Sequence, residues 1–219
     1  MRAAVLAGGR IRATAELKRL VSACDLVLAA DSGLHHAQTL EVRPDKIVGD
    51  FDSVSPQVLA RYADVPRQRH PRAKDQLDLE LALDVATREG ARELIIVGSL
   101  GGRLDQTLAT ILIAARHKKL GTGVSLHTGN LEVHYLTTGE LLELDVEVKR
   151  RFSTLSLEGA ATVSIFGARF PLKRQSLPFG VGLGVSNEVT ASPLTVEVID
   201  GLLAVILERR SSRPRSRVK

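Results

Sequence analysis

The feature that most constrains the fold is a series of short, uninterrupted apolar runs in the first half of the chain. Strands that are buried on both faces have such runs, and helical patterns lie between them here. Strands and helices that alternate at this spacing form right-handed βαβ units. The sequence therefore predicts an α/β region with a mainly parallel sheet. Its strands are expected at residues 3–7, 26–30, 46–49, 65–69 and 94–98, and its helices at 13–23, 55–62, 76–89 and 104–119.

The second half of the chain has a different pattern, in which apolar residues come in short alternating runs joined by Gly, Pro and Ser. This pattern is typical of a small antiparallel β-sandwich. Strands are expected at residues 140–148, 152–157, 162–166, 186–189, 194–199 and 202–207, with Gly201 in a turn before the last one. We therefore predict an α/β domain over residues 1–136, a β-sandwich domain over 137–208 and a disordered basic tail over 209–219.

Composition excludes several classes of protein. The last twelve residues hold six of the 30 basic and one of the 25 acidic residues, so the rest of the chain carries 24 of each. With 3% aromatic residues and no Trp, this balance argues against nucleic acid as a partner. Cys24 is the sole cysteine, which excludes an intrachain disulfide. No apolar run is long enough for a membrane span, and the first is too short for a secretory leader, so we expect a cytoplasmic protein.

The sharpest local signal is Gly49-Asp50-Phe51-Asp52-Ser53, which follows a predicted buried strand. Ligands of open α/β sheets bind just beyond the carboxyl ends of strands. Two carboxylates on one side of an extended segment repel each other unless a cation or a proton lies between them. Oxygen ligands of this kind suit Mg²⁺. The alternatives at this point are a Mg²⁺ site and a polar turn in which Asp52 or Ser53 begins the next helix.

A second acidic segment runs from Lys74 to Glu80 and also has two interpretations. Asp75 as N-cap and Asp78 three residues later resemble a capping box, which would make both acids structural. Alternatively, both acids face the same site as Asp50 and Asp52. A third segment, Gly98 to Asp105, leaves a buried strand and opens a helix. Its backbone N–H groups and Arg103 are suited to binding phosphate.

Together these segments resemble the thiamine pyrophosphokinase family. The motifs occur in the family's order and extend over nearly the whole chain up to about Leu207. They are Asp31-Ser32-Gly33-Leu34-His35, Gly49 to Ser53, Lys74 to Glu80, Gly101 to Gln106, and Ser186-Asn187-Glu188. Five motifs in order, spread over both predicted domains, indicate the family far more strongly than any one of them.

The resemblance implies an enzyme that transfers pyrophosphate from ATP to the hydroxyl of thiamine, with Mg²⁺, giving thiamine diphosphate and AMP. It implies that residues 1–136 form the ATP-binding catalytic domain. Residues 137–208 would then form the thiamine-binding and dimerisation domain. The active site of the implied homodimer would lie between the α/β domain of one subunit and the sandwich of the other.

The resemblance also assigns roles to twelve residues. Four acids would hold Mg²⁺: Asp50, Asp52, Asp75 and Asp78. The phosphate charge would be stabilised by Arg103 and the backbone of Gly101 and Gly102, with Asp105 near the reacting groups. The nucleotide side would be lined by Asp31 and Gly33, and thiamine would be contacted from the partner subunit by Ser186 and Asn187.

Five positions depart from the family pattern, namely Ser32, His35, Leu77, Gln106 and Thr110. They leave open a related pyrophosphokinase that uses another hydroxymethyl acceptor such as a pterin. A non-catalytic sensor of nucleotide or thiamine and an RNA-binding protein that depends on its tail are the other hypotheses.

Overall fold

The computed structural model describes residues 1–70 and 76–209. In the first half, strands and helices alternate: β1 (Arg2–Leu6), α1 (Ala15–Ser22), β2 (Leu26–Ala30), η1 (Asp31–Gly33), α2 (Leu34–Leu40), β3 (Lys46–Gly49), α3 (Pro56–Arg61), β4 (Arg67–Arg69), α4 (Asp78–Arg88), β5 (Glu93–Val97) and α5 (Leu104–Lys119). Strands make up most of the second half: β6 (Gly123–His127), β7 (Leu131–Thr137), β8 (Leu141–Leu144), β9 (Arg151–Phe166), β10 (Leu172–Pro178), η2 (Gly182–Gly184), β11 (Asn187–Glu188) and β12 (Leu194–Glu208).

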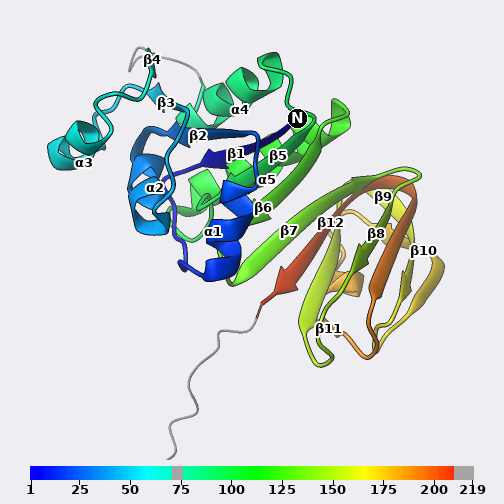
Figure 1. Cartoon of the computed structure of the whole chain (residues 1–219). Helices are drawn as coiled ribbons and strands as arrows, with labels where there is room; N and C mark the ends of the chain where they lie inside the picture. The colour runs from blue at the N-terminus through cyan, green and yellow to red at the C-terminus, as the bar shows by residue number, and fades with distance from the viewer. Residues whose placement is uncertain (71–75, 210–219) are drawn as a thin grey trace, which may run out of the picture.

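One mixed sheet runs through the molecule in the order β10-β9-β12-β7-β6-β5-β1-β2-β3-β4 (Figure 1). The strands from β4 to β6 are parallel, and the pairing becomes antiparallel between β6 and β7. The sequence predicts the mainly parallel sheet but not its strand β6. The chain builds β2 on one side of β1 and later places β5 on the other side. Strand order therefore reverses between β1 and β5, and such a switch point opens a crevice at the carboxyl ends of the strands.

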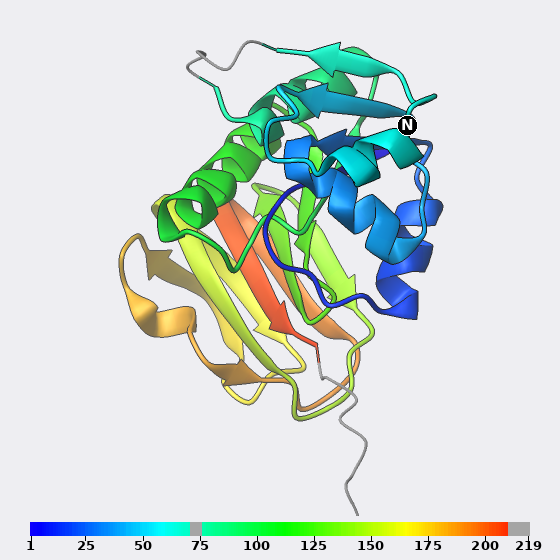
Figure 2. The same cartoon turned by 90° about the vertical axis from the view of Figure 1, so that its left-hand side faces the viewer.

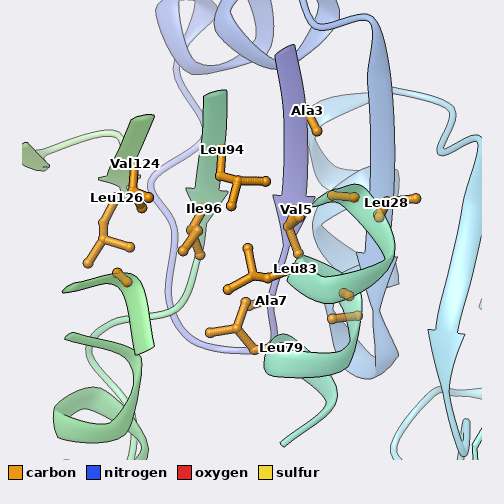
Figure 3. Close-up of a cluster of buried hydrophobic side chains, with 14 of the residues drawn as sticks. Ala3, Val5, Ala7, Leu28, Leu79, Leu83, Leu94, Ile96, Val124 and Leu126 are labelled. Atoms are coloured by element: carbon orange, nitrogen blue, oxygen red, sulfur yellow. The ribbon is translucent and has the colours of Figure 1, made fainter. Parts of the chain in front are cut away.

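Helices cover both faces of the parallel strands (Figure 2), which explains their continuous apolar runs. Along β1, Ala3 and Val5 point towards α4 and α5, whereas Ala4 and Leu6 point towards α1 and α2. Figure 3 shows the hydrophobic cluster on the face of the sheet that α4 and α5 cover, in which Leu83 of α4 packs on the strands. Every one of these side chains is removed from water, so both faces contribute to the hydrophobic stabilisation of the sheet.

Local signals explain where several helices begin. Ser55 caps α3, because its hydroxyl accepts from the Val58 N–H at 3.4 Å, and Pro56 occupies the first helical position, as predicted. The capping-box interpretation of the second acidic segment is wrong. Helix α4 has Leu77 as its N-cap and begins at Asp78, so Asp78 is its first residue. Asp75 lies outside the described residues.

The antiparallel strands enclose a third core, formed by residues of β9 and β12 together with shorter strands. The predicted turn at Gly201 is wrong, because β12 continues through this residue. Register shifts between Val198 and Leu203 bulge the strand there, and Gly201 adopts a φ of 100°. The bulge bends β12 without ending it, so one strand pairs with β8 in its first part and with β7 in its second.

Strand β7 spans the predicted domain boundary at residues 136 and 137. It pairs with β6 of the parallel part and with β12 of the antiparallel part, so the sheet passes across the boundary. The structure is thus an α/β fold on a mixed sheet, and the division into two domains remains a prediction. Among the described helices, none combines the length and the apolar character that crossing a bilayer requires.

Candidate active site

A cavity of about 150 Å³ lies at the switch point of the sheet. Its walls come from the segments that follow β1, β2 and β5 and from the first turns of α4 and α5. The lining residues include Gly8, Gly9, Asp31, Ser32, Leu77, Asp78, Ser99, Gly102, Arg103, Gln106, Thr107 and Thr110. Four predicted site residues and four departures from the family pattern thus meet residues that the sequence analysis did not single out, above all Gly8, Gly9 and Thr107.

Three carboxylates gather beside this cavity, at the ends of two neighbouring strands. Asp31 follows β2, and Asp50 and Asp52 follow β3; each offers an oxygen within 4.8 Å of the others. The Ser53 hydroxyl donates to Asp31 Oδ2, and the Asp52 N–H donates to Asp50 Oδ1 at 3.1 Å. The family resemblance assigns Asp31 to the nucleotide side, whereas the structure places it among the predicted metal ligands.

The environment of Asp31 fits a divalent cation. Its Oδ1 atom is buried and receives no hydrogen bond from the described residues. Burial, together with the negative charges of Asp78 and Asp50, raises the pKa of this carboxyl above its ordinary value. A buried anionic oxygen without a donor, close to two further carboxylates, matches the oxygen-only ligand set that Mg²⁺ prefers.

Asp78 reaches the same place from the first turn of α4. A Cβ added to Gly49 would lie 3.2 Å from Asp78 Oδ1 and 3.1 Å from the Cβ of Asp31, so both side chains pack against the end of β3. Gly49 also has a φ of 144°, which favours glycine. The fourth predicted metal ligand, Asp75, lies outside the described residues.

The backbone around the cavity is held in unusual conformations. Asp31 has a φ of 46° and Phe51 a φ of 68°, values that are uncommon for residues other than glycine. Gly33 is buried, and a Cβ there would lie 2.0 Å from the Leu6 carbonyl oxygen. The structure thus explains this glycine by close packing of the turn after β2 against β1.

Arg103 precedes α5 at the mouth of the cavity. Asp105 holds its guanidinium in a bidentate pair, with Nε 3.1 Å from Oδ1 and Nη2 2.5 Å from Oδ2. Gly102 lines the cavity, whereas Gly101 adopts a φ of 78° in the turn beside it. Asp105 therefore orients the planar cation that the sequence predicts as a phosphate contact.

Ser186 and Asn187 do not line this cavity in their own chain. The Asn187 side chain is buried: its Nδ2 donates to the Phe170 carbonyl at 2.9 Å, and its Oδ1 accepts from the Phe170 N–H at 3.1 Å. Ser186 is exposed, with a φ of 61°. Asn187 therefore anchors the segment from which Ser186 projects.

A larger cavity of about 480 Å³ lies between α1 and strands β6 to β8. Its polar side chains include His127, Glu132 and His134, and none of the predicted site residues that the structure describes lines it. We place the candidate site in the smaller cavity, because the carboxylates, the glycine turns and Arg103 meet there at the carboxyl ends of parallel strands.

A parallel sheet with glycine turns, an arginine and clustered carboxylates at its switch point defines a class, the α/β enzymes that act on phosphorylated ligands. Comparison with known proteins narrows this class. Residues 17–126 match the family model for the thiamin pyrophosphokinase catalytic domain, and residues 142–203 match that for the thiamin pyrophosphokinase vitamin B1 binding domain. The chain therefore belongs to the thiamin pyrophosphokinase family and is a transferase of the kinase type.

Individual relatives agree with this assignment. The chain is 28% identical to a thiamine pyrophosphokinase of Bacillus subtilis (strain 168) over 206 residues, covering 92% of this chain and 96% of the relative. It is 26% identical over 166 residues to thiamin pyrophosphokinase 1 of Caenorhabditis elegans, covering 73% of this chain and 68% of the relative. A crystal structure of thiamine pyrophosphokinase from Bacillus subtilis superposes with a TM-score of 0.85 at 25% identity, covering 96% and 100%. The fold is also shared by thiamin pyrophosphokinase from Candida albicans, with a TM-score of 0.75 at 17% identity, covering 94% of this chain and 88% of that structure.

Proposed function

We propose that this protein transfers the pyrophosphoryl group of ATP to the hydroxyl of thiamine, giving thiamine diphosphate and AMP. The hydroxyl oxygen forms a bond to the β-phosphorus, and the bond from that phosphorus to the oxygen shared with the α-phosphate breaks. The hydroxyl proton leaves to a base, and AMP leaves with the bond electrons. The observation that carries the proposal is the cluster of Asp31, Asp50 and Asp52 beside the cavity that the glycine turns and Arg103 line.

The negative charges of the site are compatible with binding the anionic triphosphate of ATP only when a cation is also present. Asp31, Asp50, Asp52 and Asp78 would repel a triphosphate, so we assign them as the residues that hold Mg²⁺ and orient it. Asp75 stays a predicted member of this set. Bound there, Mg²⁺ would neutralise phosphate charge as the transferred group moves.

The backbone turns and Arg103 would contact the phosphates of ATP directly. The backbone N–H groups of Gly8 and of the Gly101–Gly102 turn would donate hydrogen bonds to phosphate oxygens, as at other glycine-rich strand ends. Arg103, oriented by Asp105, would bind a phosphate oxygen in a planar fork. Positioning and charge neutralisation of this kind supply most of the catalysis in phosphoryl transfer. We assign acceptance of the hydroxyl proton to one carboxylate of the acidic set.

We further propose that a second copy of the chain completes the site. Leu104, Leu108 and Leu112 form a stripe on α5, with exposed fractions of 72%, 53% and 63%. The same helix lines the cavity, so an apolar contact there would bring a partner close to it. Ser186, which is remote from the cavity of its own chain, would then contact thiamine across the interface. We assign the enzyme to the cytoplasm.

The dimer is tested by the molar mass in solution. We expect twice 23.6 kDa for the natural chain and a folded, inactive monomer for Leu108→Glu. A monomeric natural chain with full activity would refute the shared site.

The metal site is tested by Asp50→Asn, with Asp145→Asn as the matched control. Asp145 is an exposed acid of the antiparallel part, remote from the cavity residues. We expect Asp50→Asn to lower kcat by about a hundredfold or more, because phosphate charge is no longer neutralised. Asp145→Asn should retain the natural rate. Equal rates in the two variants would remove Asp50 from the site.

A further inference from the structure

His36 contacts the turns that line the cavity from behind, although it does not line the cavity itself. It is the third residue of α2, and its side chain is half-buried. The Nε2 atom lies 3.0 Å from the carbonyl oxygen of Gly9, in the turn that follows β1. A Cβ added to Gly98, in the turn that follows β5, would lie 2.6 Å from His36 Cδ2 and 2.8 Å from Nε2. The imidazole therefore contacts both turns at once.

These two turns are also joined directly. The Gly9 N–H donates to the Gly98 carbonyl, and the Arg10 N–H donates to the Leu100 carbonyl at 2.9 Å. Gly9 and Ser99 both line the cavity, so the backbone geometry at this junction sets its shape. Gly9 cannot carry a larger side chain, because a Cβ there would lie 2.5 Å from the Gly98 carbonyl oxygen.

The chemistry of the contact defines the state of the ring. The Gly9 carbonyl only accepts hydrogen bonds, so Nε2 must carry a proton and donate it. Burial lowers the pKa of His36 below its ordinary value, which favours the neutral ring with a proton on Nε2. The hydrogen bond from Nε2 fixes the orientation of the peptide group between Gly9 and Arg10, while the Gly9 N–H donates to the Gly98 carbonyl.

We propose that His36 is a positioning residue that holds the Gly8–Gly9 turn and the Gly98–Ser99 turn in the geometry that binds the phosphates of ATP. This inference rests on the proposed function in one respect, because it takes a nucleoside triphosphate as the ligand of the cavity. It assigns His36 no contact with substrate. Its effect passes through the Gly9 carbonyl, because the position of a turn that binds a ligand matters on the scale of about 1 Å.

The test uses two substitutions of similar size. His36→Leu fills the space and removes the donor, whereas His36→Gln keeps an N–H donor of similar reach. The control is His134→Leu, because His134 is also half-buried and hydrogen bonded, to Glu132 at 3.4 Å, but lies on β7 outside the candidate site. Melting temperatures identify variants that do not fold. If His36→Leu does not fold, His36→Ala takes its place.

Two readouts separate positioning from simple stability. The first is the affinity for ATP with Mg²⁺ in the absence of thiamine, measured by calorimetry. The second is the KM for thiamine beside the KM for ATP. We expect His36→Leu to weaken ATP binding by about tenfold, the effect of one buried hydrogen bond, while the KM for thiamine changes less than about twofold. His36→Gln should recover most of the affinity, and His134→Leu should bind ATP as the natural chain does.

ATP affinity in His36→Leu within about twofold of the natural value would overturn the inference, as would an equal loss for ATP and thiamine. The outcome is distinct from failure of the proposed reaction. A natural chain that binds ATP but releases no AMP would refute the transfer, while the ATP affinities of the variants would still decide the role of His36. A natural chain that does not bind ATP would overturn both.

Discussion

Replacing Asp31 by Asn should stabilise the metal-free protein while it impairs function. Asn is neutral, its Oδ1 can still accept the hydrogen bond of Ser53, and it tolerates the φ of 46° at this position. The substitution therefore removes one negative charge from the cluster with little change of shape. A site built to hold a cation should gain stability from such a change, because its carboxylates repel each other when no cation is present.

The geometry gives the size of this effect. At 4.8 Å, two unit charges repel by about 0.9 kcal/mol in water and by about 3.5 kcal/mol at an effective dielectric constant of 20. Asp52 is exposed, so we take the lower end and expect a gain of about 1 kcal/mol in unfolding free energy. For a chain of 219 residues, this corresponds to about 2 °C in melting temperature.

The gain should depend on pH and on metal. Because the pKa of Asp31 is raised in the folded protein, the unfolded chain releases this proton first as pH rises. The destabilising charge is therefore present at pH 7.5, and the advantage of Asp31→Asn should shrink as pH falls towards about 4. Mg²⁺ at ten times its dissociation constant should raise the stability of the natural chain by about 1.4 kcal/mol, and that of the variant far less.

The assay is thermal unfolding of both chains in a chelator and in MgCl₂, with Asp145→Asn as the control. A variant that melts below the natural chain in chelator at pH 7.5 would refute the repulsion argument. A rise with Mg²⁺ as large in Asp31→Asn as in the natural chain would remove Asp31 from the metal site.

Three further predictions address the core, the phosphate contact and the acid stability. Leu83→Ala should lower the unfolding free energy by about 3 kcal/mol and the melting temperature by about 6 °C, because the side chain is fully buried between α4 and the sheet. Thermal unfolding curves measure this loss. Arg103→Lys keeps the charge but loses the fork that Asp105 orients, so the KM for ATP should rise about tenfold in steady-state kinetics. Burial lowers the pKa of His117, so stability should fall as pH drops through about 6.5; urea titrations at pH 7.5 and 5.5 should show a smaller loss in His117→Gln.

The parallel sheet was predictable because its signal is local. Runs such as Leu26–Ala30 are apolar at every position, and the structure buries both faces of that strand. The sequence does not predict helix α2 (Leu34–Leu40), since the helix is short and its N-cap is Gly33, which gives it no side-chain capping signal. The sequence predicts a turn at Gly201 where the structure has a bulge, because glycine at positive φ serves both structures.

The candidate site was predictable in its residue types but not in its full arrangement. The sequence indicates that Asp50 and Asp52 follow a strand, yet it does not give the order of strands in the sheet. That order places the end of β2 beside the end of β3 and so brings Asp31 to the carboxylates. Gly8 and Gly9 lacked a recognised motif, although their place at the end of the first buried strand could have indicated them.

The most direct test of the central claim is product analysis of the purified protein with ATP, Mg²⁺ and thiamine. We predict AMP and thiamine diphosphate in equal amounts, with neither formed when Mg²⁺ is chelated. Binding of ATP and thiamine without either product would contradict the claim and indicate a sensor. Release of AMP with a pterin or another hydroxymethyl acceptor, but not with thiamine, would contradict the assigned substrate while leaving the carboxylate site in place.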